Sequence, residues 1–256
     1  MNNNLHGEEI LNLLQNHRSI RHFKQKRIPR ETLEMILISA RSAPSSSHGQ
    51  AYSIINITNL EKKEKLATYA GNQQQVINCS NFFVFCADLN RLDNIAGAEQ
   101  EDIEEVLNST EMFLIATVDA TLVAQNLAIA AEALGLGIVY TGGIRNNPRK
   151  VSQLLKLPNR VFPVFGMCVG YPEPHQIPEK KPRLPLSVIY HEEEYNSYDK
   201  ISHHIEHYDE LMKKYYLMRT QGKRGDTWSH TMTDKRKIPR RMFMKEFLKE
   251  RGFPLC

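Results

Sequence analysis

Residues 131–148 read AEALGLGIVYTGGIRNNP and join a helix, a strand and a turn in one short stretch. Apolar residues spaced by three and four predict a long helix over 110–134, ended by the glycine that follows it. Residues 138–140 then predict a strand that leads into the Gly-Gly turn. Pro148 suits the first position of a short helix, with Asn147 as its candidate N-cap.

The long helix carries a stripe rich in alanine. The members of the stripe are Ala116, Ala120, Val123, Leu127, Ala130 and Leu134. Small side chains let another helix approach closely, so this helix is either the central helix of the core or part of a dimer interface. The sequence leaves both alternatives open.

Other segments extend this pattern on both sides. Three more strands are predicted, over residues 52–57, 82–87 and 161–169, and 82–87 is expected to be central because it is apolar throughout. A helix is expected around 205–218. Two amphipathic helices joined by a basic loop are predicted near the start, with stripes at Ile10, Leu13, Leu14 and His17, and at Leu33, Ile36, Leu37 and Ala40.

The composition is ordinary for a globular protein. The chain has 256 residues, of which 41% are hydrophobic and 24% are charged, so disordered and collagen-like classes are disfavoured. We expect a single domain over 1–256. The composition shifts to proline, charge and tyrosine after Tyr171, so residues from about 173 to 256 are expected to wrap over the core or a partner subunit.

Charge and hydropathy indicate the cellular location of the protein and the classes of partner that it could bind. The first residues, MNNNLHGEEI, lack the features of a signal peptide, and the chain has no uninterrupted apolar run of about 18 residues. We therefore expect a cytoplasmic protein with no membrane partner. A net charge of +4 is too small to indicate nucleic acid, but it suits an anionic cofactor.

Two separated basic segments are candidate anion sites. The first is HRSIR at residues 17–21, and the second is KPR at residues 181–183. Arginine forks and a lysine point charge suit a phosphate group. Taken singly, each has an ordinary alternative: basic residues at a helix end complement its dipole, and a basic, proline-rich loop is commonly a solvated connector.

Several motifs together make the chain similar to one family. They are HRSIRHF, SARSAPSSSHGQ, FFVFCADLNR, AEALGLGIVYTGGIRNNP, KPRLPLSVIYHE and YYLMRTQGKRGDTWS. Through them the chain resembles the nitroreductase superfamily, specifically the oxygen-insensitive NADPH nitroreductases and related NADPH-FMN reductases. The resemblance spans nearly the whole chain and implies a three-layer α+β fold, with a mainly antiparallel central sheet flanked by helices, in an intertwined homodimer.

The resemblance also implies a site that binds FMN at the dimer interface. The residues it assigns to FMN are His17, Arg18, Ser19, Arg21, Ser45, Ser46, Ser47, Gln73, Tyr140, Thr141, Gly142, Gly143, Lys181 and Arg183. The serine run is expected to reach the flavin of the other subunit, and backbone N–H groups of the glycine turn are expected to face the flavin near N5. The alternatives are an ordinary turn for the serines and glycines, and a solvated loop for Gln73, whose register the adjacent glutamines blur.

The same resemblance implies, through two arginines, that NADPH is the electron donor. Arg219 and Arg224 match family arginines associated with the 2′-phosphate of NADPH, and a solvated basic loop is the alternative. No G-x-G-x-x-G motif follows a predicted strand, so the nicotinamide cofactor is expected to stack transiently on FMN in a ping-pong cycle.

The expected reaction is hydride transfer from NADPH to FMN, followed by two-electron delivery to a nitroaromatic, quinone or free flavin. No side chain is expected to act as a nucleophile, acid or base. A dedicated NADPH:FMN reductase is the alternative enzyme, and a basic nucleic-acid-binding module is the alternative outside enzymes. His203 and His207 lack a third ligand, so no metal site is expected.

Overall fold

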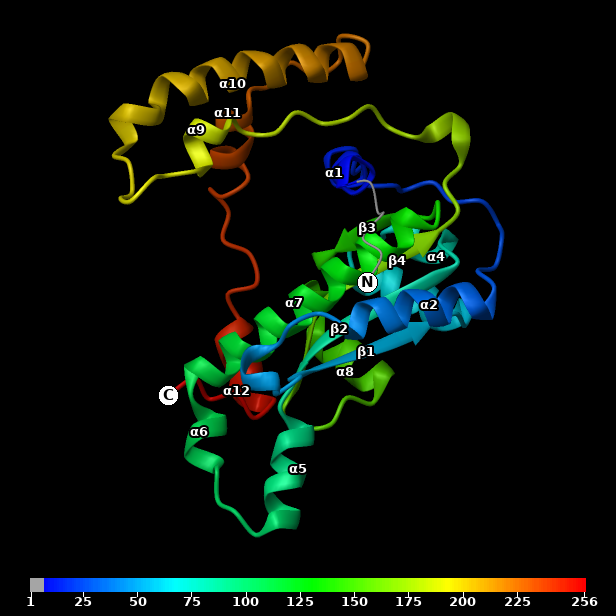
Figure 1. Cartoon of the computed structure of the whole chain (residues 1–256), viewed down its shortest axis with the longest axis vertical. Helices are drawn as coiled ribbons and strands as arrows, with labels where there is room; N and C mark the ends of the chain where they lie inside the picture. The colour runs from blue at the N-terminus through cyan, green and yellow to red at the C-terminus, as the bar shows by residue number, and fades with distance from the viewer. Residues whose placement is uncertain (1–6) are drawn as a thin grey trace. The chain divides into compact units, whose positions relative to one another are not determined.

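The strand β2 (Asn81–Asp88) is buried along its whole length and occupies an inner position of a four-stranded sheet (Figure 1). This computed structural model describes residues 7–256. The strand order is β1 (Tyr52–Ile57), β2, β4 (Val161–Gly170) and β3 (Gly137–Thr141), and every neighbouring pair is antiparallel. The predicted antiparallel sheet with a central 82–87 strand is therefore confirmed.

Alternating side chains of β2 face two different helical layers, because successive residues of a strand point to opposite sides. Phe82, Val84 and Cys86 pack in one apolar cluster. The helices that contribute to this cluster are α3 (Leu60–Tyr69), α4 (Gln74–Asn78) and α8 (Pro148–Leu155). Asn147 is the N-cap residue of α8 and Pro148 its first residue, as predicted, but the Asn147 side chain makes no capping hydrogen bond and donates instead to the carbonyl of Tyr69 at 3.2 Å.

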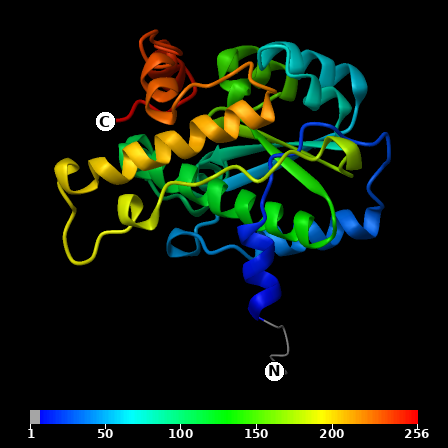
Figure 2. The same ribbon diagram turned by 90° about the horizontal axis from the view of Figure 1, so that it is seen from above.

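The opposite face of the sheet is covered by α2 (Arg30–Arg41) and α7 (Thr110–Ala133) (Figures 1 and 2). Phe83 and Phe85 of β2 join this second cluster. Helices on both faces of one sheet make three layers, as predicted.

The helix α7 confirms the predicted 110–134 element to within one residue at its C-terminal end. Four members of the alanine-rich stripe are buried, namely Ala116, Ala120, Val123 and Leu127. Ala130 is half-buried, and Leu134, just beyond the helix, is 42% exposed. By length and composition α7 could cross a membrane, but core helices meet the same test, and this helix packs on the sheet and on α2.

The outer sides of α2 and α7 remain apolar and exposed within the described residues. We define the apolar surface as Met35 and Ile38 of α2 and Leu114, Val118 and Leu122 of α7. These two helices contact each other, and α1 (Gly7–Gln15) also contacts α7. None of the residues of α1 is buried, so the predicted stripe of this first helix packs against no core within the described residues.

The described residues also form shorter elements outside these layers and a second compact unit. Those of the first compact unit are α5 (Asn90–Glu99), α6 (Glu104–Asn108), α12 (Met244–Glu250) and the 3₁₀ turns η1 (Ser46–His48), η2 (Gly142–Asn146) and η3 (Pro174–Gln176). This unit extends to Pro178 and resumes at Arg241–Cys256.

The second compact unit is Glu179–Arg240 and contains α9 (Leu186–Ile189), α10 (Tyr198–Arg219) and α11 (Trp228–Asp234). The helix α10 confirms the predicted 205–218 helix and extends it toward the N-terminus. The apolar centre of this unit is formed by Tyr208, Met212, Tyr215 and Tyr216.

Gly143 is required by close packing. A Cβ at Gly143 would overlap the carbonyl oxygen of Ala70, whereas a Cβ at Gly142 would meet the movable guanidinium of Arg145 at 3.3 Å. The two adjacent glycines therefore differ, because a backbone oxygen cannot move aside without shifting the chain.

We expect Gly143→Ala to lower the free energy of unfolding by about 1–3 kcal/mol, as overpacking does. Gly142→Ala is the matched control and should change it much less. Urea denaturation followed by circular dichroism, on protein freed of bound ligands, measures both. Equal losses for the two variants would contradict this assignment.

Candidate active site

The first basic segment lies along the free edge of β3. The backbone N–H of Ile20 donates to the carbonyl of Ile138 at 2.9 Å, and Ser19 forms a parallel bridge with Ile138. Gly137 allows this approach, because a Cβ there would lie 2.6 Å from the side chain of Ile20. The sheet edge thus places residues 17–21 beside the strand that leads into the glycine turn.

His17 is held by a carboxylate that the sequence did not single out. Its Nδ1 lies 2.6 Å from Oε1 of Glu132, in the last turn of α7. The two side chains are 30% and 15% exposed, so the pair is partly shielded from water. Glu132 therefore orients the imidazole at the start of the basic segment. No local pattern could reveal this pair, because the two residues are 115 positions apart.

The two arginines of this segment have capacity for an anion. Nε of Arg18 is buried and has no hydrogen-bond partner among the described residues. Arg21 is exposed, and its Nη1 donates to the carbonyl of Ser19 at 3.3 Å. A guanidinium has five N–H donors, so both side chains retain donors for a ligand.

The glycine turn and the glutamine loop contact each other. Asn146 Nδ2 donates to the carbonyl of Ala70 at 3.3 Å, and Gly143 packs on the same carbonyl. The backbone N–H of Gln73 donates to the carbonyl of Ala67, which fixes the loop three residues beyond Ala70. The structure therefore places Gln73 and the Gly-Gly turn in adjacent loops.

Tyr140 turns its side chain toward the protein. Its hydroxyl lies 3.1 Å from Oε1 of Gln125, and its ring packs edge-on against Phe165, with centroids 5.3 Å apart. Burial, with a smaller contribution from the negative charge of Glu132, raises the pKa of Tyr140 to about 12. The phenol is therefore neutral at physiological pH and donates to Gln125. Thr141 is buried as well, so this strand could meet a ligand mainly through its backbone.

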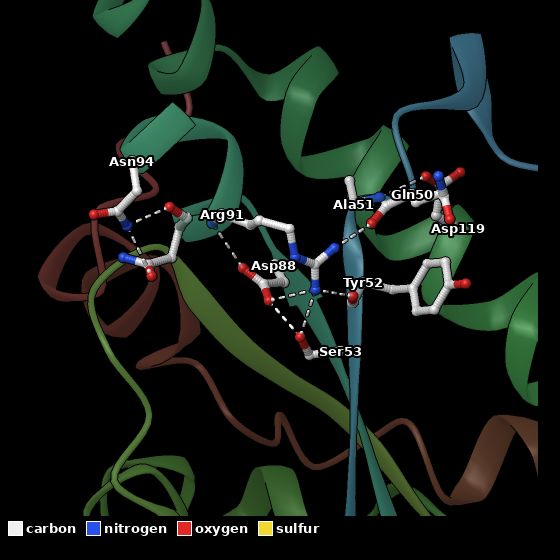
Figure 3. Close-up of polar contacts among 9 residues, drawn as sticks. Gln50, Ala51, Tyr52, Ser53, Asp88, Arg91, Asn94 and Asp119 are labelled. Carbon is white, nitrogen blue, oxygen red and sulfur yellow. Dashed lines mark hydrogen bonds and ion pairs between the residues drawn. The ribbon is translucent and has the colours of Figure 1, made fainter. Parts of the chain in front are cut away.

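Two side chains, which we call the clamps, hold the backbone of the serine run and of the residues that follow it. Asp119 of α7 is fully buried, and its two oxygens accept from the N–H groups of Ser46 and Ala51, each at 3.0 Å. On the other side, Arg91 donates to the carbonyls of Gln50 and Tyr52, each at 3.0 Å (Figure 3). Sequence reasoning missed both clamping residues.

The clamped loop has an unusual backbone. Ser47, His48 and Gln50 adopt left-handed φ angles of 47°, 58° and 49°. Such conformations are costly for residues other than glycine and persist where the surroundings fix them. Ser45 Oγ accepts from the N–H of Gln50, whereas no hydrogen bond within the described residues uses the hydroxyl of Ser46 or Ser47. The clamps therefore present two free hydroxyls.

The serine run and the basic segment attach to α7 at two different levels. Asp119, near the middle of the helix, holds the serines, and Glu132, in its last turn, holds His17; the two carboxylates are 13 positions apart, which corresponds to about 20 Å of helix. Within one chain, the structure does not bring the serine run to the basic segment.

The remaining candidate residues lie in the second unit, on its tyrosines. Arg224 stacks on the ring of Tyr216, with 3.7 Å from its guanidinium carbon to the ring centroid, and the Lys181 ammonium lies 5.5 Å from the same centroid. Arg219 Nη1 donates to the hydroxyl of Tyr215 at 3.2 Å.

Lys181 and Arg183 are held by the backbone around them. The hydroxyl of Tyr208 donates to the carbonyl of Pro182 at 3.0 Å, and Arg183 Nη1 donates to the carbonyl of Lys181 at 3.0 Å. Lys181, a candidate for the flavin, and Arg224, a candidate for NADPH, thus contact the same tyrosine, Tyr216.

The positive charge around Tyr216 lowers the pKa of its hydroxyl. Burial raises the pKa of Tyr216, but the hydrogen bond and charge of Lys181, with the charges of Arg224 and Lys235, outweigh it and lower the pKa below its ordinary value. A site that stabilises a phenolate also favours other anions. Among residues 7–256, no three His, Cys, Asp or Glu side chains cluster as metal ligands.

Comparison with known proteins gives two family models that together cover most of the chain. Residues 14–171 match the model of the Nitroreductase family, and residues 181–256 match the model of the Nitroreductase family, C-terminal domain. The chain is 45% identical over 254 residues to FMN reductase (NADPH) of Bacillus subtilis, covering 99% of each chain. It is 41% identical over 243 residues to the oxygen-insensitive NADPH nitroreductase of Salmonella typhimurium, covering 95% of this chain and 97% of that protein.

Solved structures agree with the sequence relatives. The structure of NfrA1 nitroreductase from B. subtilis superposes with a TM-score of 0.92 at 44% identity, covering 96% of this chain and 99% of that one. Because both the motif order and the full-length fold match, the chain belongs to the nitroreductase family.

Proposed function

We propose that this protein is an FMN-dependent NADPH oxidoreductase that reduces nitroaromatics, quinones or free flavins in a ping-pong cycle. The observation that carries the proposal is that the basic segment and the glycine turn lie together at the edge formed by β3. There, the Nε of Arg18 is buried and has no hydrogen-bond partner among residues 7–256, and Arg18 and the exposed Arg21 lie on a segment paired with the strand that enters the glycine turn. Relatives named FMN reductase (NADPH) and NADPH nitroreductase support it.

The residues of the first unit fit FMN on structural grounds. Arg18 and Arg21 would hold the phosphate or ribityl oxygens, and His17, oriented by Glu132, would lie at the same end. Gly142 and Gly143 carry no side chain that would cover their own backbone, so a flat ring could approach it. When bound, FMN supplies two-electron redox chemistry between NADPH and the acceptor.

Each side chain then has a limited task. The arginines bind and orient the cofactor, and backbone N–H groups of the turn would stabilise negative charge on the reduced ring. NADPH and the acceptor would occupy the same face in turn, because the chain has no dinucleotide-binding motif of its own. No protein nucleophile, acid or base is needed.

Flavin binding is the direct test. The purified protein should be yellow and release FMN on denaturation. Arg21→Ala should lower FMN occupancy after dialysis, since a charged hydrogen bond contributes about 1.5–3 kcal/mol. His22→Ala, at the adjacent exposed position, is the matched control and should keep its flavin. A colourless protein with steep, salt-dependent binding to DNA would instead support the nucleic-acid alternative.

The active form is proposed to be a homodimer with FMN at its interface. The serine run lies about 20 Å of helix away from the basic segment, so one chain alone cannot close the site with both. The apolar surface on α2 and α7 gives a second copy a place to pack. A partner related by a two-fold axis would bring its serine run to the basic segment of the first chain.

We expect Val118→Glu to give a monomer that loses flavin, because it places a charge in the apolar surface. Val118 is 53% exposed, and Ile95→Glu on α5, where Ile95 is 50% exposed, is the matched control that should remain dimeric and yellow. Light scattering coupled to gel filtration measures the mass. A wild-type monomer that is fully loaded with FMN would refute the shared site.

NADPH preference is proposed to depend on Arg219 and Arg224. Both are held against tyrosine rings, which limits their freedom and lowers the entropic cost of binding a phosphate. Replacing both by Ala should raise KM for NADPH by about 10-fold or more while sparing NADH. Lys213→Ala, an exposed lysine on α10, is the control. Equal losses with both nucleotides would remove the specificity assignment.

The identity of the electron acceptor also belongs to this proposal. A dedicated NADPH:FMN reductase would turn over free FMN much faster than a nitroaromatic, and comparing the two kcat/KM values distinguishes the alternatives. A cytoplasmic location also belongs to this proposal.

A further inference from the structure

A second anion site is suggested by a cavity that none of the flavin or NADPH candidates lines. The cavity has a volume of about 520 Å³, within the size range of small-molecule sites. We call it the basic cavity. Its five cationic lining residues are Lys24, Lys26, Arg27, Arg30 and Lys63, and none of its lining residues is acidic. Such an excess of positive charge favours an anionic occupant.

Lys63 is the central observation. Its side chain belongs to α3 and is only 6% exposed, yet it lines the basic cavity. Its Nζ donates to the carbonyl of Cys79 at 2.7 Å, and no ion pair within the described residues neutralises it. An ammonium group has three donors and is costly to bury without a counter-charge. An anion in the cavity would supply both the missing charge and an acceptor.

The other walls add neutral polar groups. Asn56, Thr58, Asn78, Ser80 and Asn81 line the cavity beside the cations. Asn81 Nδ2 donates to Oδ1 of Asn56 at 3.0 Å, which fixes both amides. These side chains could hydrogen-bond the uncharged part of a ligand.

The first turn of α2 also lines the basic cavity. Arg30 and Leu33 belong to this turn, and Pro29 at the N-cap makes no side-chain cap. The positive end of the helix dipole therefore adds to the charge of the lysines. Arg30 is itself paired with Glu34 at 2.9 Å, so it contributes less than the other four cations.

The basic loop over the cavity has a fixed backbone. The N–H of Lys24 donates to the carbonyl of Tyr171 at 2.9 Å, and the N–H of Ile28 donates to Oγ of Ser80 at 3.1 Å. Between them, the Lys26 ammonium lies 4.2 Å from the centroid of the Tyr171 ring. Anchoring at both ends means that little order has to be gained when a ligand binds.

We propose that the basic cavity binds a phosphate group, either free phosphate or the phosphate of a small metabolite, with Lys63 as its buried anchor. Lysine point charges and the Arg27 fork match a phosphate in charge and hydrogen-bonding capacity. The volume exceeds what a single phosphate fills, so the walls formed by Asn56 and Asn81 have room for an attached nucleoside or sugar. The ligand is bound and is not transformed.

The experiment measures anion binding to the FMN-loaded protein, so that the flavin phosphate site is already filled. Inorganic phosphate and AMP are titrated by calorimetry at constant ionic strength, with adenosine as the uncharged probe. The same titrations in the Arg219→Ala/Arg224→Ala double variant exclude the proposed NADPH site. Tighter binding of AMP than of phosphate identifies a phosphorylated metabolite as the ligand, and equal binding identifies free phosphate.

Lys63→Met should weaken phosphate binding by about tenfold or more, since it removes a charged hydrogen bond. Lys62→Met, at the neighbouring exposed position of α3, should not. If Lys63→Met does not fold, Lys26→Gln/Arg27→Gln on the loop must give the same loss. Absence of phosphate and AMP binding to the wild type, or equal binding by all variants, would overturn the proposal. FMN content and NADPH oxidation report separately on the proposed function.

Discussion

Complete burial of β2 is the constraint on which the rest of this structure depends. All eight residues of the strand are shielded from water, so both faces of the sheet must be covered by helices. Phe83 and Phe85 on one side and Phe82 on the other are fully buried, and each large apolar side chain contributes about 1.5–3 kcal/mol when removed from water. The two helical layers follow from this need, and α7 is the longest element that meets it.

Placing α7 on the sheet also determines where polar groups can be held. Its buried side carries Asp119, whose carboxylate is satisfied by two backbone N–H groups, and its last turn carries Glu132. One helix therefore fixes two loops that are candidate parts of the site, about 20 Å apart along its axis. The outer side of the same helix is apolar and exposed. The helix α7 therefore keeps the serine run and the basic segment apart within one chain. It also offers a surface on which a second chain could pack and bring its own serine run to this basic segment.

Positive charge is distributed over distinct places in this fold. Residues 17–21 continue directly into the basic loop, and the buried Ile20 and Phe23 anchor the chain on the way. Arg18 and Arg21, on either side of Ile20, lie beside β3, and the residues after Phe23 line the basic cavity. The net charge of +4 understates this pattern, because acidic residues elsewhere balance much of it.

The sequence by itself determined the four strands, the extent of α7 and the motif order of the family, because these depend on local periodicity, on turn-forming glycine and on residues close together in the chain. Only the tertiary structure decided that the Asn147 side chain bonds to Tyr69 rather than to its own helix, and that α1 has no buried residue. The same holds for the clamps of Asp119 and Arg91 and for the burial of Lys63. Each of these depends on a partner brought close by packing of the sheet and helices, and hydrophobic periodicity carries no information about which distant polar groups will meet.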